Sequence, residues 1–117
     1  MKEKPLIDSN ETKILSLSVK TKFTENGIVS RTLLQTPSVR VTLFAFGEGQ
    51  ELTPHTNQRR ALVQILEGQC EFLFGGNWQK LERGALVHLP PNDSHAVRAT
   101  GPFKMLLALY DDAATKV

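Results

Sequence analysis

Apolar residues occur along this chain in short bursts that are as long as β-strands. Each burst is rich in Val, Ile, Leu or Phe, and turn-forming Gly, Pro, Asn and Asp separate the bursts. The bursts cover residues 14–19, 28–34, 39–46, 62–66, 70–74, 86–89 and 103–110. No window sustains apolar residues at the spacing i, i+3, i+4 and i+7 that a helix requires. Short strands at this regular spacing predict an all-β sandwich or barrel.

The N-terminal residues differ from the rest of the chain. Residues 1–11 are polar apart from Leu6 and Ile7, and they show no sustained hydrophobic period. We therefore expect residues 1–11 to form a flexible arm and residues 12–117 to form one barrel domain. The length of 117 residues is also that of a single domain.

Some of the predicted strands are apolar on both faces. Residues 41–46 and 105–110 carry apolar side chains at nearly every position. One face of such a strand fills the interior of a barrel, and the other face needs a second cover. A partner subunit is the economical cover for a domain of this size, and the alternative is that the N-terminal arm folds over the face. We expect a homodimer.

Composition and charge argue against other classes of partner. The chain is 40% hydrophobic and 22% charged with a net charge of +2, which favours a globular protein and predicts no binding to nucleic acid. The longest apolar run, residues 105–110, is too short to span a membrane. No apolar segment resembling a secretory signal follows Met1, and the single Cys70 permits no internal disulfide. We therefore expect a cytoplasmic protein, with Cys70 as a small buried side chain.

Two stretches containing histidine repeat one plan of a glycine turn, a strand and a further turn. The matching positions are Gly49, His55 and Gly68 in the first stretch and Gly84, Pro90 and His95 in the second. With these spacings the sequence resembles the cupin superfamily, whose motifs read G-x5-H-x-H-x3-E-x6-G and G-x5-P-x-G-x2-H-x3-N. The resemblance implies a double-stranded β-helix, which is a small jelly-roll barrel with a metal site inside.

The chain departs from these motifs at the metal ligands. Asn57 stands at the second histidine, Ala61 at the glutamate, Asn92 at the later glycine and Ala99 at the asparagine. The resemblance implies three imidazoles and one carboxylate, a set that suits a divalent transition metal. Only His55 and His95 remain of that set. We expect no cofactor or one weakly bound divalent transition metal, with water and the Asn57 carbonyl oxygen as possible further ligands.

Strand alternation extends the predicted site along the barrel wall. If Ala61 points into the barrel, Val63 and Ile65 point inward as well and form an apolar wall. The predicted ligand pocket consists of His55, Asn57, Ala61, Val63, Ile65 and His95. Because histidine titrates near neutral pH, a buried pair of imidazoles could serve instead as a general base and a hydrogen-bond partner.

Three further residues have roles that the sequence leaves open. His88 lies two residues before Pro90. Facing inward it would be a third imidazole and a metal ligand, and facing outward it would belong to the surface or an interface. Arg59 and Arg60 lie in the loop predicted to form the pocket rim, where they could clamp a carboxylate by paired hydrogen bonds or could simply be solvated.

Two functions from different classes follow. The first is a binding module that holds a small, partly apolar organic ligand near His55 and His95 with weak or no metal. The second is a metal-dependent cupin enzyme of the dioxygenase, decarboxylase or isomerase type, with the same histidines as ligands. Asn57 and Ala61 favour the first function, whereas the retained histidines favour the second. We favour the binding module, leave enzymatic activity undecided and assign no substrate.

Overall fold

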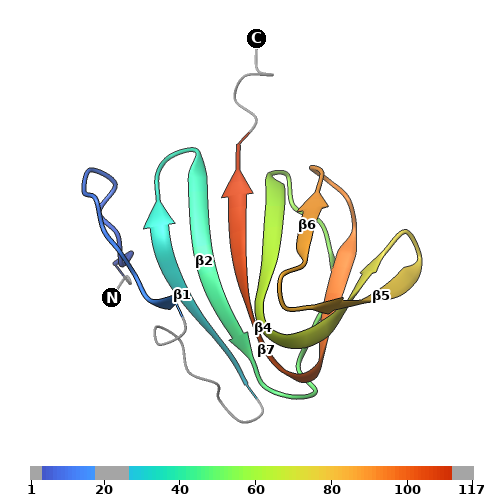
Figure 1. Cartoon of the computed structure of the whole chain (residues 1–117). Helices are drawn as coiled ribbons and strands as arrows, with labels where there is room; N and C mark the ends of the chain where they lie inside the picture. Colours follow the sequence, from blue (N-terminus) through green and yellow to red (C-terminus); the bar gives the residue numbers. More distant parts are fainter. Residues whose placement is uncertain (1–3, 18–26, 112–117) are drawn as a thin grey trace.

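The structure is a computed structural model that describes residues 4–17 and 27–111 (Figure 1). The described residues form seven strands, and all the strand pairs are antiparallel. In chain order the strands are β1 (Ile28–Gln35), β2 (Val39–Phe46), β3 (Glu51–His55), β4 (Arg60–Phe74), β5 (Asn77–Glu82), β6 (Leu86–Leu89) and β7 (His95–Tyr110). Within the described ranges, no helix has the length and apolar character needed to cross a membrane.

The long strands β4 and β7 take part in both layers of a barrel. One layer has the order β1-β2-β7-β4-β6, and the other has the order β3-β7-β4-β5. The register between β4 and β7 shifts between Ile65 and Glu67 and again between Gly68 and Cys70, where both strands pass from one layer to the other. This jelly-roll arrangement confirms the predicted all-β, cupin-like fold class.

Gly68 permits the close approach of β4 and β7 at the point where both strands pass from one layer to the other. Its φ is +74°, which is the left-handed region that glycine favours. A Cβ atom at this position would also collide with the carbonyl oxygen of Pro102 on β7. The glycine is therefore required both by the backbone conformation and by the approach of the neighbouring strand.

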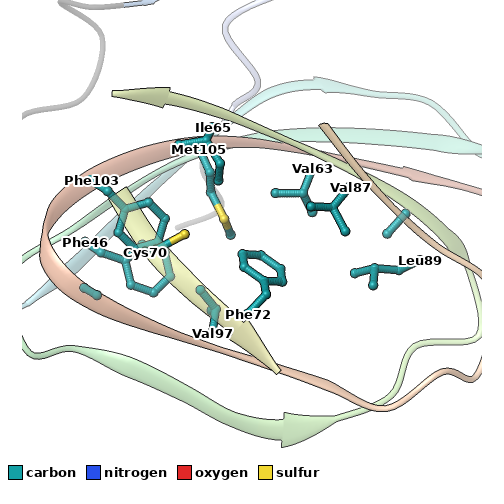
Figure 2. Packing of buried hydrophobic residues seen from close by; sticks show 12 residues of the cluster. Phe46, Val63, Ile65, Cys70, Phe72, Val87, Leu89, Val97, Phe103 and Met105 are labelled. Atoms are coloured by element: carbon teal, nitrogen blue, oxygen red, sulfur yellow. The ribbon is translucent and has the colours of Figure 1, made fainter. Parts of the chain in front are cut away.

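The inward side chains of both layers fill the barrel. At one end the rings of Phe46 and Phe103 stack with their centroids 4.5 Å apart. Cys70 belongs to the same cluster, and all three side chains are fully buried (Figure 2). We call this region, the lower end of the barrel in Figure 1, the closed end.

Most of the predicted strands are confirmed. The bursts at 28–34, 39–46 and 86–89 correspond to β1, β2 and β6, those at 62–66 and 70–74 both belong to β4, and that at 103–110 belongs to β7. Strands β3 and β5 were not predicted because they are not apolar bursts. The strand predicted at 14–19 is wrong for residues 14–17, which are in no strand, whereas residues 18 and 19 lie outside the described residues.

The N-terminal segment contacts the edge of β1. The Leu6 N–H donates to the carbonyl oxygen of Thr32 at 3.2 Å, and the Ile7 N–H donates to that of Leu33 at 2.8 Å. The flexibility of the arm stays a prediction, and its residues 1–3 lie outside the described residues.

The outer face of β2 is largely covered within one chain. Leu43 and Ala45 alternate with the inward residues of β2, yet both are 0% exposed. Leu86 on β6 is in contrast 66% exposed. This part of the outer face therefore needs less cover from a partner than its sequence suggests, and the homodimer stays a prediction.

Candidate functional site

A small cavity lies inside the barrel at the end opposite Phe46 and Phe103. Its volume is about 50 Å³. The described residues that line it come from both layers and are Phe44, Leu52, Val63, Phe72, Leu89, His95, Val97, Met105 and Leu107. We call this region, where β6 and β7 end at the top of Figure 1, the open end. Among these lining residues, His95 alone carries a polar side chain.

The His95 ring is oriented by the turn that precedes β7. Its Nδ1 lies 3.2 Å from the Asp93 carbonyl oxygen, and because that oxygen can only accept, Nδ1 must carry the proton that is donated. In the neutral ring Nε2 is then the acceptor nitrogen. Asn92 in the same turn has a φ of 69°, and its N–H donates to the Asn57 carbonyl oxygen at 2.7 Å. The turn is thereby fixed to the loop that follows β3.

The backbone places His55 opposite His95. The two residues are register partners in the pairing of β3 with β7. The sequence prediction that they approach each other in the folded barrel agrees with this register. The side chain of His55 lies outside the described part of the structure.

The other predicted polar residues of the site form contacts of their own. The Asn57 Oδ1 accepts a hydrogen bond from the Arg59 N–H at 2.8 Å. The Arg59 guanidinium forms an ion pair with Asp111 at 3.6 Å. The Arg60 guanidinium lies 2.9 Å from Nε2 of His88. Neither arginine is among the described residues that line the cavity.

His88 points away from the barrel interior. It is exposed, whereas its neighbours Val87 and Leu89 on β6 are buried in the core. Because side chains alternate along a strand, His88 lies on the outer face. The structure thus resolves the orientation that the sequence left open, and His88 is not brought to His95.

The predicted apolar wall is buried, but only one of its members lines the cavity. Ala61, Val63 and Ile65 are 3%, 2% and 1% exposed and belong to the core cluster. Val63 lines the cavity, whereas Ala61 and Ile65 pack above and below it along β4. Several lining residues were missed, and strand alternation counted from His95 could have found Val97, two residues further along β7.

The side chains at the open end do not fit a complete metal site. The described residues contain no group of three or more His, Cys, Asp or Glu that could hold an ion. Ala61 offers no ligand atom, and one Asn57 Oδ1 lone pair is already used by Arg59. Of the ligand set implied by the motifs, His55 and His95 are the members that the chain retains.

The Cys70 thiol is unreactive near neutral pH. Burial, and to a smaller extent the neighbouring Glu71 carboxylate, raises the pKa of its thiol from 9.0 to about 12. The thiol therefore stays protonated near neutral pH, and a protonated thiol is neither a good nucleophile nor a metal ligand. Its position at the closed end also separates it from His95.

Comparison with known proteins identifies the class to which this barrel belongs. The family model described as "Cupin domain" matches residues 42–109. Because this match covers more than half of the chain, the protein belongs to the cupin family. No curated protein matches the chain.

Solved structures with the same fold cover nearly the whole chain. A conserved Streptococcus pyogenes protein of unknown function is 28% identical with a TM-score of 0.81, covering 95% of this chain and 96% of its own. A cupin superfamily protein from Desulfitobacterium hafniense is 26% identical with a TM-score of 0.82, covering 96% and 100%. A cupin 2 conserved barrel domain protein from Leptotrichia buccalis is 34% identical with a TM-score of 0.79, and the match covers 83% of this chain and 47% of that one.

Proposed function

We propose that this cupin domain binds a small, partly apolar organic molecule at the open end, with His95 as its hydrogen-bond partner. The observation that carries the proposal is the cavity beside His95, because its other described lining residues are apolar. Sites for small molecules typically combine an apolar wall with few well-placed polar groups. The Asp93 carbonyl oxygen fixes the ring, so that Nε2 of the neutral ring accepts a hydrogen bond from a ligand hydroxyl or amine.

The size of the cavity limits the part of the ligand that it encloses. A volume of about 50 Å³ is far below the roughly 300–1,000 Å³ of pockets that enclose drug-sized ligands. It suits a short branched alkyl group. The remainder of a larger ligand would lie at the mouth of the barrel.

A metal-dependent activity is the second candidate, and one observation favours it. The register partnership of His55 and His95 across β3 and β7 supports a site with two histidine ligands. Two imidazoles completed by water would bind a divalent transition metal weakly. Titration with cobalt, followed by absorbance, tests this candidate: saturable binding of one cobalt ion per chain would favour it over a metal-free binding module.

Isobutanol is a suitable probe for the binding function because it joins a branched alkyl group to one hydroxyl donor. We expect it to shift the NMR signals of residues that line the cavity. In His95→Leu the hydroxyl loses its acceptor, and the affinity should fall about fivefold, as expected for a hydrogen bond of about 1 kcal/mol.

The matched control is His88→Leu, which makes the same change on the outer face. We expect this variant to bind isobutanol as the parent protein does. Equal affinities of the parent protein and His95→Leu would contradict the role of His95. A parent protein whose cavity signals do not respond to isobutanol would contradict the binding function itself.

A further inference from the structure

An arginine that the sequence analysis did not single out lies on the inner face at the open end. Arg40 is near the start of β2, and it alternates in phase with Thr42, Phe44 and Phe46. Phe44 lines the cavity and Phe46 is buried at the closed end. Because the pairing of β2 with β7 runs without a register shift, Arg40 shares the inner face with these residues.

Contacts on both sides agree with this orientation. Arg40 is the register partner of Leu109, which packs against the core cluster. One guanidinium nitrogen of Arg40 lies 3.5 Å from the hydroxyl oxygen of Thr32 on the neighbouring strand β1. Arg40 itself is exposed. It therefore stands on the rim of the open end, in the layer facing the one that carries His95.

The charge of Arg40 is not matched by a nearby carboxylate in the described structure. Ion pairs join Arg59 to Asp111 and Arg98 to Glu71. Among residues 4–17 and 27–111, no such ion pair within 4.0 Å is found for Arg40. A guanidinium presents several donors in a fork that matches a carboxylate. Arg40 does not itself line the cavity. It adds a cation at the rim, on the same face of β2 as the lining residue Phe44.

We propose that the ligand of this site is a small carboxylate whose short apolar chain occupies the cavity and whose carboxylate binds Arg40. This inference rests on the proposed binding function and deepens it by assigning the chemical class of the ligand. It also changes the expected anion-binding residue. The sequence offered Arg59 and Arg60 as candidates for that role, with a solvated loop as the alternative, and in the structure their guanidinium groups contact Asp111 and His88.

Isobutyrate and isobutanol form a matched pair of probes, because they share the branched alkyl group and differ in the carboxylate. We expect the parent protein to bind isobutyrate about tenfold more tightly than isobutanol at low ionic strength, a ratio within the range of one charge-assisted pair. Added salt should reduce this preference because the arginine is exposed. NMR titration of both probes measures it.

Arg40→Gln removes the charge and retains a polar side chain. We expect it to abolish the preference for isobutyrate while its affinity for isobutanol changes less than about twofold, which also shows that the cavity is intact. Arg83→Gln is the control, because it makes the same change in net charge in the turn between β5 and β6.

Each remaining outcome overturns the inference in a recognisable way. Equal affinity of the parent protein for both probes overturns the carboxylate assignment and leaves the binding function standing. An equal loss in Arg83→Gln and Arg40→Gln shows a general effect of net charge and also overturns it. If the parent protein binds neither probe, the binding function and this inference both fail.

Discussion

The two ends of the barrel are built from the same strands and differ in what fills them. At the closed end, Phe46 and Phe103 stack with Cys70 beside them, and none of the three is exposed. At the open end, the same strands β2 and β7 frame a cavity next to His95. Tight packing at one end supplies stability, and this leaves the other end able to carry a polar ring and unfilled space.

Two phenylalanines on one strand test this difference most strongly. Phe46 is fully buried at the closed end, whereas Phe44, two residues earlier on β2, is half-buried and lines the cavity. Phe46→Ala should lower the free energy of unfolding by about 3–5 kcal/mol, the usual cost for a buried phenylalanine.

Phe44→Ala is the matched variant, and it should cost roughly half as much because its ring is less buried and already borders empty space. Chemical denaturation measures both changes. A cost for Phe44→Ala that equals or exceeds that of Phe46→Ala would show that the open end contributes as much stability as the closed end.

Substitution at Gly68, where β4 passes from one layer to the other near the closed end, should also lower the stability. Gly68→Ala places a methyl group against the Pro102 carbonyl oxygen at a φ of +74°. We expect a loss of roughly 2–4 kcal/mol, from left-handed backbone strain and overpacking together. Gly75→Ala is the control, since Gly75 has a φ of +62° with open space around its Cβ position.

Gly75→Ala should therefore show the backbone strain alone, about 1–2 kcal/mol. The difference between the two variants, measured by denaturation, isolates the effect of the close approach of β7. Equal losses of stability in the two variants would mean that β4 and β7 can move apart at Gly68 at little cost in free energy.

Much of the fold was predictable because burial dictates the apolar pattern of its strands. β2 was predicted with its observed bounds, since both of its faces are covered. β5 was missed because its side chains are mostly exposed, and a polar segment carries no burial pattern. β4 was predicted as two strands because Gly68 resembles a turn. In the barrel, Gly68 instead marks the point where this single strand passes from one layer to the other.

The site was predictable only where position along a strand determines orientation. His95 and Val63 were both predicted, and both line the cavity. The orientation of His88 was not, because alternation cannot be counted reliably through the turn at Pro90. The contact of Arg59 with Asp111 joins residues far apart in the sequence, so no local pattern could reveal it.

The smallest expected effect tests whether the packing of the closed end keeps water away from the Cys70 thiol. The Cys70 thiol has a pKa of about 12 in the folded protein, against an ordinary value of 9.0. Above about pH 9 the unfolded chain releases this proton while the folded protein retains it, so the unfolded state binds fewer protons and stability falls as the pH rises. The stability from this group is complete below about pH 9 and declines towards pH 12.

Cys70→Ala removes the titrating group and leaves other alkaline titrations in place. Between about pH 9 and 11, the free energy of unfolding of the parent protein should fall more steeply than that of the variant, by roughly 1 kcal/mol per pH unit. The small cavity in the variant shifts its stability at every pH and leaves the slope unchanged. Urea denaturation across this range measures both slopes. If the slopes coincide, water or a compensating charge reaches Cys70, and the closed end is less dry than its packing indicates.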